Sequence, residues 1–316
     1  MKKFFALLVV GLAFAAQAQD AYPSRAVNAI VGFPPGGISD LILRQLAEGM
    51  RSKFPAGLVV LNKPGGGGTT ALSVLSADKP DGYNFAIAPN ANLSIGPQIS
   101  SLHFKNPDDY TVVMNTVSSA PVLVVKADSP VKNAKEFVAA AKAQPGVLSV
   151  GYPGEASVSQ LSLAQISRAT GIKVINVPFA GWAQGSPALL GGHVFAMIAQ
   201  PGEVMPYLQA GTLRAIGTVS PTRLESAPQI PTWKEQGFDV ALGTKYYLVV
   251  PKATPANVVK YIHDAAKATM DEPSFKEFAK QRGVEIEYAD GKKSKEWLWE
   301  DYKSSTVLLQ QVGLLK

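Results

Sequence analysis

The 316-residue sequence contains no cysteine, and this absence excludes more classes of protein than any other feature of the composition. It rules out disulfide scaffolds, thiolate catalysis, Cys-ligated zinc, iron–sulfur clusters and a lipid-modified N-terminal cysteine. Histidine is also scarce: His103, His193 and His263 are isolated in the sequence. They form neither a zinc-binding pair at i, i+4 nor an evident catalytic base. We therefore expect no metal ion and no cofactor.

Long apolar runs are equally rare, since no segment reaches the 18 consecutive apolar residues typical of a membrane span. A shorter run begins at Phe4, follows Lys2 and Lys3, and ends before Ala16-Gln17-Ala18. This order is typical of a secretory signal peptide, which we predict over residues 1–18. Its removal lowers the formal net charge from +6 to +4, because two lysines are lost. With no cysteine to carry a lipid, the mature chain is expected in the periplasm as an unanchored monomer.

Short β-branched runs alternate with helical patterns as far as residue 250, which is typical of βαβ units. We expect strands at residues 26–32, 58–62, 85–88, 111–117, 122–126, 148–152, 173–177, 194–199, 213–218 and 246–250. Residues 255–315 have a nearly all-helical pattern. Ten strands are too many for one open sheet with such short loops, so two lobes are predicted. We assign residues 19–125 and 247–316 to lobe 1 and residues 126–246 to lobe 2, with two crossings between them.

Three predicted strands end in glycine-rich loops that are suited to hold an anion. The first contains Pro34-Pro35-Gly36-Gly37 and leads into a helix, the second contains Gly65-Gly66-Gly67-Gly68, and the third runs from Gly151 to Ser157. Glycine has no Cβ, so backbone N–H groups can approach a ligand closely, and a helix N-terminus favours negative charge. Ligands of open α/β sheets bind beyond the carboxyl ends of strands. The sequence therefore predicts an anion site in a cleft between the lobes.

No catalytic constellation accompanies these loops. The four residues Ser129-Pro130-Val131-Lys132 match an S-x-x-K pattern without its companion elements, and no G-x-S-x-G elbow is present. The residues Gly66, Gly68 and Ala71 match a dinucleotide fingerprint, but no acidic residue ends the next predicted strand. The small excess of basic over acidic residues is spread along the chain and does not indicate nucleic-acid binding. We predict a binding protein and no enzyme, with a secreted hydrolase as the alternative from another class.

Eight short segments occur in an order that identifies a family. They are Tyr22-Pro23-Ser24-Arg25, Phe33-Pro34-Pro35-Gly36-Gly37, Asn62-Lys63-Pro64-Gly65, Asp81-Gly82-Tyr83, Val177-Pro178-Phe179, residues 189–194, Gly211-Thr212-Leu213-Arg214-Ala215 and Ile230-Pro231-Thr232. Together they resemble the periplasmic solute-binding proteins of tripartite tricarboxylate transporters, the Bug family. The resemblance implies an α/β, two-lobed type II periplasmic binding protein fold, a Venus flytrap in which each lobe is a mostly parallel sheet flanked by helices.

The same resemblance implies a function and partners. It implies capture of a small carboxylate in the interlobe cleft and delivery to membrane subunits of a tripartite tricarboxylate transporter. A sensor role, in which the loaded protein is presented to a membrane receptor, fits the same features and stays open.

The resemblance also implies which residues contact the ligand. One carboxylate is held by backbone amides and water at the first loop, which matches Phe33, Gly36, Gly37, Ile38, Ser39 and Asp40. A second carboxylate is held near the glycine loop and lobe 2, which matches Gly68, Thr69, Thr70, Ala71 and Ser157. The expected lining is completed by Asn92, Phe179, Gly181, Trp182 and Gln200.

Several of these positions depart from the family pattern. Ile38 stands where a hydroxyl residue is usual, Gln160 replaces a histidine, Gln200 replaces an asparagine, and Phe179-Ala180-Gly181 replaces Tyr-Lys-Gly. Trp182 adds bulk. The pocket is therefore expected to be less polar than usual, which favours a longer aliphatic dicarboxylate or an aromatic carboxylate over a hydroxylated tricarboxylate.

Overall fold

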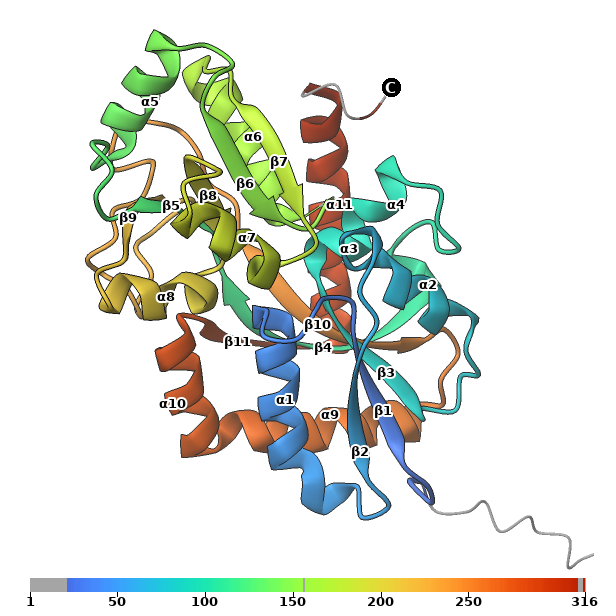
Figure 1. The fold of residues 1–316 in the computed structure, drawn as a ribbon. Coiled ribbons are helices and arrows are strands. Elements are labelled where there is room, and N and C mark those ends of the chain that lie inside the picture. Colours follow the sequence, from blue (N-terminus) through green and yellow to red (C-terminus); the bar gives the residue numbers. More distant parts are fainter. Residues whose placement is uncertain (1–21, 156, 312–314, 316) are drawn as a thin grey trace, which may run out of the picture.

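The chain forms two lobes, each built on one β-sheet, in a computed structural model that describes residues 22–155, 157–311 and 315 (Figure 1). The predicted signal peptide, residues 1–18, lies outside the described residues. Within the described ranges, none of the helices combines the length and the apolar character needed to cross a bilayer. The two sheets, with helices around them, agree with the predicted two-lobed architecture.

The first lobe contains a six-stranded sheet with the strand order β11-β4-β10-β3-β1-β2. Its strands are β1 (Val27–Val31), β2 (Leu58–Asn62), β3 (Asn84–Pro89), β4 (Tyr110–Ser119), β10 (Thr244–Pro251) and β11 (Glu285–Asp290). Strand β1 pairs in parallel with β2 and β3, whereas β10 and β11 run antiparallel to their neighbours. The helices of this lobe are α1 (Ile38–Met50), α2 (Thr69–Ala77), α3 (Asn90–Ser94), α4 (Gly96–Ile99), α9 (Ala256–Asp271), α10 (Pro273–Arg282) and α11 (Gly291–Gln311), with short 3₁₀ turns at Arg51–Lys53, Gly66–Gly68 and Pro107–Asp109.

The second lobe contains a five-stranded sheet with the order β7-β6-β8-β5-β9. Its strands are β5 (Val122–Lys126), β6 (Ser149–Pro153), β7 (Ile175–Phe179), β8 (Ala196–Ala199) and β9 (Leu213–Thr218). Strand β6 is parallel to β7 and β8, and β5 is antiparallel to β8 and β9. The helices are α5 (Ala134–Ala143), α6 (Val158–Thr170), α7 (Trp182–Leu190) and α8 (Pro201–Gln209). Both sheets are therefore mixed, with parallel pairs on one side and antiparallel pairs on the other.

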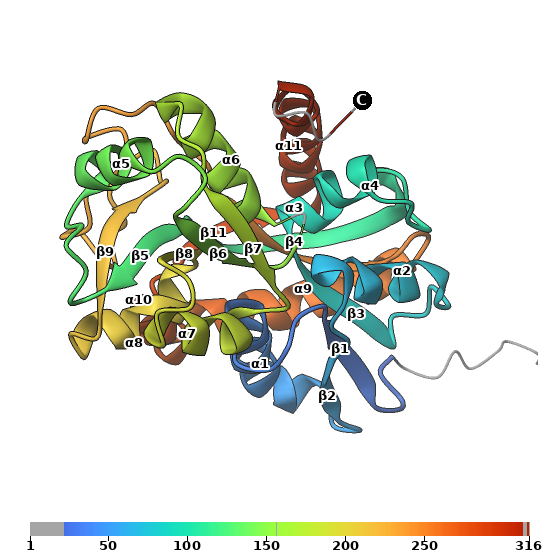
Figure 2. The same cartoon turned by 45° about the horizontal axis from the view of Figure 1, so that its top comes forward.

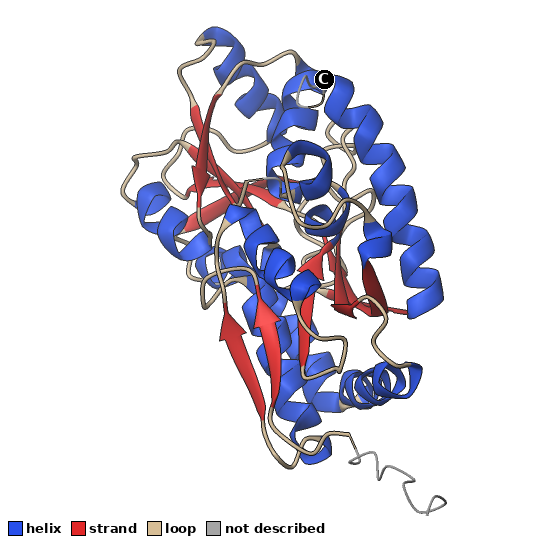
Figure 3. Cartoon of the chain, turned by 90° about the vertical axis from the view of Figure 1, so that its right-hand side faces the viewer, coloured by secondary structure: helices blue, strands red, loops and turns tan. Residues whose placement is uncertain are grey.

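The central strands read as continuous apolar runs because helices cover both faces of each sheet (Figure 3). In β1, Val27, Ala29 and Val31 pack into one cluster with α1, α9 and α10, whereas Ile30 packs into a second cluster with α2 and α11. Successive side chains of a strand point to opposite faces, so one short strand supplies both cores.

The pattern of residues 255–315 predicts a nearly all-helical segment. This prediction is wrong at one place, because β11 forms at the edge of the six-stranded sheet. Its sequence alternates acidic residues with Ile286 and Tyr288, which are 40% and 41% exposed. Acidic residues have low strand propensity and blunt an exposed edge. The strand is held by pairing with β4, which sequence periodicity does not reveal.

The chain crosses between the sheets twice. It passes from β4 to β5 through Ala120 and Pro121, and it returns in the segment that leads from β9 to β10. Of the predicted boundaries, residues 125–126 lie inside β5 of the second sheet, and residues 246–247 lie inside β10 of the first sheet. A small apolar cluster also joins the lobes, in which Ala91 of α3 and Ile95, the residue after α3, pack with Val158 of α6.

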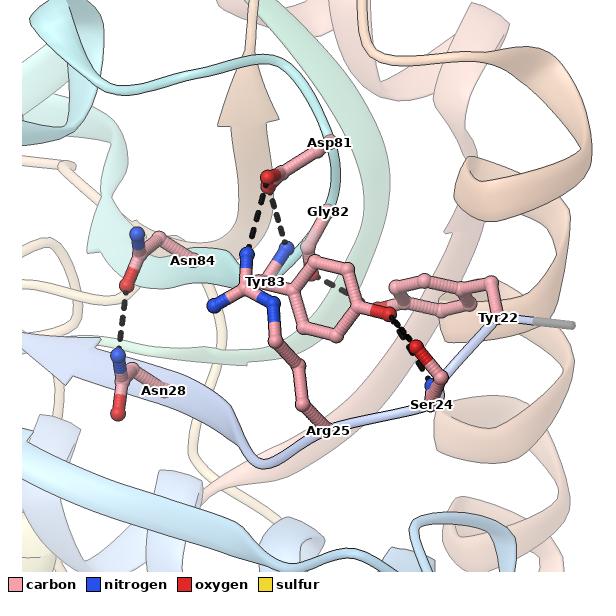
Figure 4. Close-up of polar contacts among 8 residues, drawn as sticks. All are labelled: Tyr22, Ser24, Arg25, Asn28, Asp81, Gly82, Tyr83 and Asn84. Atoms are coloured by element: carbon pink, nitrogen blue, oxygen red, sulfur yellow. Dashed lines mark hydrogen bonds and ion pairs between the residues drawn. The ribbon is translucent and has the colours of Figure 1, made fainter. Parts of the chain in front are cut away.

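Two of the family-like segments hold residues 22–25 against the first sheet (Figure 4). The Tyr22 hydroxyl donates to the Gly82 carbonyl at 2.8 Å, and Arg25 pairs with Asp81 at 3.1 Å. The Arg25 guanidinium also lies 3.8 Å from the centre of the Tyr83 ring, which gives a cation–π contact. These two segments therefore anchor the beginning of β1 next to β3.

Candidate ligand-binding site between the lobes

Residues from both lobes line one cavity with an empty volume of about 580 Å³. From the first lobe it is lined by Phe33, Pro34, Pro35, Gly37, Ile38, Ser39, Pro89, Ala91, Asn92, Thr244 and Tyr246. From the second lobe it is lined by Pro153, Ser157, Val158, Ser159, Gly181, Trp182, Ala183, Gln200 and Glu203. This space includes open solvent at the mouth of the cavity, and residues of both lobes face one another across it.

Four helices of nine or more residues begin at this cavity, and each follows the carboxyl end of a strand. They are α1 after β1, α6 after β6, α7 after β7 and α8 after β8. The first residues of α1, α6 and α7 line the cavity, and α8 contributes its N-cap Gln200 and Glu203. Figures 1 and 2 show the start of α7 beside α1, although the two helices belong to different sheets. The first N–H groups of a helix have no partner within it, and its N-terminus carries partial positive charge. This arrangement can hold an anion without a cationic side chain.

Nine of the sixteen residues predicted to contact the ligand line the cavity: Phe33, Gly37, Ile38, Ser39, Asn92, Ser157, Gly181, Trp182 and Gln200. The other seven do not line it: Gly36, Asp40, Gly68, Thr69, Thr70, Ala71 and Phe179.

Asp40 supports the first loop from behind the cavity. Its side chain is 2% exposed, and it accepts hydrogen bonds from the Gly36 N–H at 3.0 Å, from Arg44 at 3.0 Å and from Asn62 at 2.8 Å. Burial alone would raise the pKa of Asp40, but these hydrogen bonds and the positive charge of Arg44 lower the pKa below its usual value. The carboxylate and the Gly36 amide thus satisfy each other and hold the shape of the loop.

The glycine loop packs behind the lining residues. Gly68 lies so close to Phe33 and Asn92 that an added Cβ would come within 2.8 Å of both side chains. The Asn92 side chain also donates to the Gly67 carbonyl at 2.7 Å. The loop positions Phe33 and Asn92 at the cavity.

The glycine loop also brings the lobes into contact. An added Cβ on Gly67 would lie 1.7 Å from the carbonyl oxygen of Glu155, in the loop that follows β6. Both partners are backbone, and only a residue without a side chain permits this approach. The contact closes the molecule beside the cavity.

Two further predicted positions face elsewhere. The Phe179 ring packs against Gly151 and Gly185, where an added Cβ would meet it at 2.9 and 3.2 Å. Gln160 hydrogen-bonds to Tyr152 and is not among the lining residues. These two departures from the family pattern therefore do not change the lining.

Glu203 is the main lining residue that sequence reasoning missed. It is 7% exposed, and its carboxylate accepts the Gln200 N–H at 3.0 Å. Burial raises the pKa of Glu203 to about 7, although the hydrogen bonds from the Gln200 and Ile38 N–H groups oppose the rise. The sequence could have indicated this residue, because Gln200-Pro201-Gly202-Glu203 follows the predicted strand at residues 194–199, just as the other candidate loops follow strands.

The rest of the lining combines apolar and aromatic residues with the polar side chains of Ser39, Asn92, Ser157, Ser159, Gln200 and Thr244. Phe33 and Trp182 form part of the wall, and the Trp182 ring is fixed by an edge-to-face contact with Tyr207 at 5.5 Å. The described lining residues include no lysine, arginine or histidine. In the described part of the chain, no three His, Asp or Glu side chains are grouped to hold a metal ion. The chemistry offered is recognition by amides, hydroxyls, apolar walls and one carboxylate.

Comparisons with known proteins agree with this arrangement. The model of a family described as the tripartite tricarboxylate transporter family receptor matches residues 42–314. The "UPF0065 protein in gbd 5'region" of Cupriavidus necator is 31% identical over 313 residues, which cover 98% of this chain and 95% of that protein.

Two solved structures show the same fold. The periplasmic binding protein BugD superimposes with a TM-score of 0.86 and 27% identity, covering 93% of this chain and all of that chain. The structure of R. palustris Rpa4515 with adipate superimposes with a TM-score of 0.87 and 22% identity, covering 92% and 98% of the two chains.

Proposed function

This chain belongs to the tripartite tricarboxylate transporter receptor family, and we propose that it captures a small carboxylate between its lobes and delivers it to a membrane transporter of that type. The family is one of receptors, not of enzymes. The proposed place of action is the periplasm, reached through the signal peptide predicted at residues 1–18.

The convergence of four helix N-termini on one interlobe cavity is the observation that carries this proposal. Fixed amide dipoles bind a carboxylate without the desolvation of a long cationic side chain. Ser157, the N-cap residue of α6, lies in the same wall, and its hydroxyl can also donate to an anion. The amides of α6 and α7 are the best candidates for the ligand carboxylate, because no side-chain carboxylate is hydrogen-bonded to their first turns in the described residues.

The apolar wall supports a ligand with an apolar body. The lining contains Phe33, Ile38, Val158 and Trp182, which favour an aliphatic or aromatic skeleton over a hydroxylated one. The longer dicarboxylates and the aromatic carboxylates are therefore the two proposed ligand classes. Adipate in the Rpa4515 structure is a dicarboxylate held by a protein of the same fold.

In the proposed function, the two lobes move apart to release the ligand. We place the hinge at the two crossings, residues 120–121 and the segment between β9 and β10, close to the predicted lobe boundaries. A ligand that contacts both lobes stabilises the closed form, because it binds that form more tightly than the open one. The closed form would then be the one that a transporter recognises.

Thermal unfolding of the mature chain with a panel of carboxylates tests the proposal. A ligand at 100 times its dissociation constant stabilises the native state by about 2.7 kcal/mol, which raises the Tm by about 4 °C for a chain of this size. The control is the primary amide of each acid, which keeps the body and removes the charge. Shifts with the acids and none with the amides are expected. Equal shifts, or none with any acid, would refute carboxylate capture.

A further inference from the structure

Glu203 contributes a carboxylate to a cavity that is proposed to bind an anion. Its Oε2 accepts the Gln200 N–H at 3.0 Å, and the Ile38 N–H also hydrogen-bonds to the carboxylate. Gly37 approaches so closely that an added Cβ would lie 3.6 Å from Oε1. Glu203 therefore occupies the first amide of α1 and the amide of Gln200, the residue before α8, one from each lobe, leaving α6 and α7 for a ligand carboxylate.

The charge of Glu203 has no cationic partner in the wall, because the described lining residues include no lysine, arginine or histidine. Gln200 adds a second acceptor beside it. Its amide nitrogen donates to the Thr244 hydroxyl at 2.9 Å, and its buried amide oxygen has no partner within the described residues. From β10, Tyr246 faces Glu203 with a phenol whose pKa burial raises well above its usual value, so that it stays neutral. The wall around Glu203 thus holds two acceptors, the carboxylate and the Gln200 amide oxygen, beside the neutral phenol of Tyr246.

We propose that Glu203 recognises a positively charged, hydrogen-bond-donating nitrogen, so that the ligand is a zwitterion with one carboxylate and one ammonium-type group. This inference rests on the proposed function, since the amides of α6 and α7 are assigned to the ligand carboxylate. A buried carboxylate attracts an ammonium and repels a second carboxylate, and both effects are stronger in a water-poor cavity than in bulk water. Of the two proposed ligand classes, a dianionic dicarboxylate is disfavoured and an aromatic carboxylate that carries an amine is favoured.

Two matched ligand series test this recognition by isothermal titration calorimetry. The aliphatic series is adipate, 5-aminopentanoate and pentanoate. The aromatic series is terephthalate, 4-(aminomethyl)benzoate and 4-methylbenzoate. All three acids of a series share one carboxylate and the same carbon skeleton next to it. They differ at the other end, which carries a carboxylate, an ammonium group or an uncharged methyl group. The measurements are made at pH 8, where a carboxyl with a pKa of about 7 is mostly charged.

The wild-type chain is expected to bind the ammonium member of at least one series at least about 30-fold more tightly than the dicarboxylate. In Glu203→Gln, which keeps the shape and removes the charge, that preference should fall at least about 30-fold. Glu48→Gln is the matched control, because Glu48 is exposed on α1 and pairs with the exposed Arg51. It should leave the ranking unchanged.

The outcomes separate the two proposals. If dicarboxylates bind the wild-type chain as tightly as the ammonium acids, Glu203 does not select a cation, while carboxylate capture stands. An equal effect of Glu203→Gln on all three members of a series overturns the inference in the same way. If no member of either series binds, carboxylate capture fails, and this inference fails with it. The order of ligand affinities in the wild-type chain tests the inference even if Glu203→Gln does not fold.

Discussion

Replacing Gly67 by alanine should weaken ligand binding by keeping the lobes apart. The added Cβ would lie 1.7 Å from the Glu155 carbonyl oxygen and 2.7 Å from its carbonyl carbon. An ordinary contact of this kind is about 3.5 Å or more. The loops must therefore separate by up to about 2 Å, and no flexible side chain can absorb this shift because both partners are backbone.

The expected magnitude has two parts. Gly67 has a φ of 63°, so alanine costs about 1 kcal/mol of stability from left-handed backbone alone. The clash with Glu155 adds a penalty only in the closed form. We expect the dissociation constant to rise at least about tenfold, which is a loss of about 1.4 kcal/mol of binding free energy.

Gly171→Ala is the matched control for this prediction. Gly171 has a φ of 72° at the end of α6, and an added Cβ meets nothing within 4 Å. Gly171→Ala therefore has the same free-energy cost from left-handed backbone as Gly67→Ala, but it does not disturb the contact between the lobes. Calorimetry with the tightest wild-type ligand, beside urea unfolding of each variant, separates binding from stability. Equal dissociation constants for Gly67→Ala, Gly171→Ala and the wild-type chain would refute the reasoning.

Three further predictions concern charge and cavity space. Glu203 has a folded-state pKa of about 7 against a usual value of 4.5, so its contribution to stability is fully present below pH 4.5 and is lost as the pH rises through 7. In urea unfolding, the wild-type chain should lose about 3 kcal/mol relative to Glu203→Gln between pH 4.5 and pH 8. Asp40→Asn should cost about 1–3 kcal/mol at pH 7, because the buried hydrogen bonds to Arg44 and the loop weaken, and this difference should shrink as the pH falls below 3.8 and Asp40 protonates. Ala183→Trp should fill the cavity from an exposed lining position and raise the dissociation constant at least about tenfold, whereas Ala139→Trp, on the exposed face of α5, should not change it in calorimetry.

Each of these has a result that contradicts it. A constant difference between the wild-type chain and Glu203→Gln across the pH range would mean that Glu203 does not titrate as a buried group. Unchanged stability in Asp40→Asn would mean that the first loop does not depend on this carboxylate. Normal binding by Ala183→Trp would place the ligand outside the described cavity.

Much of the fold could be predicted because it depends on local patterns. The expected strands at residues 58–62, 122–126 and 213–218 have the bounds of β2, β5 and β9. Of these, β5 lies inside its sheet and is buried, so it must be apolar on both faces, and its run of valine and leucine indicates this directly. The edge strand β11 could not be found in this way, because pairing with β4 holds its acidic sequence in the sheet.

The site could be predicted as a set of loops but not as a set of side chains. Ser39 and Asp40 are neighbours in α1, yet Ser39 lines the cavity and Asp40 packs behind it. Successive helix residues point about 100° apart, so the orientation of the helix decides which one meets a ligand. Loop composition carries no information about that orientation.

The absence of cysteine chemistry, the family, and the glycine-rich ends of strands where a ligand can reach the backbone all follow from the amino-acid sequence. These properties belong to residue types and short segments. The contact of Gly67 with Glu155, and the burial of Glu203 between Gln200 and Ile38 without a cationic partner among the described lining residues, depend on the folded arrangement of both lobes. The energy of a charge depends on all the groups around it, and folding brings those groups together from distant parts of the chain.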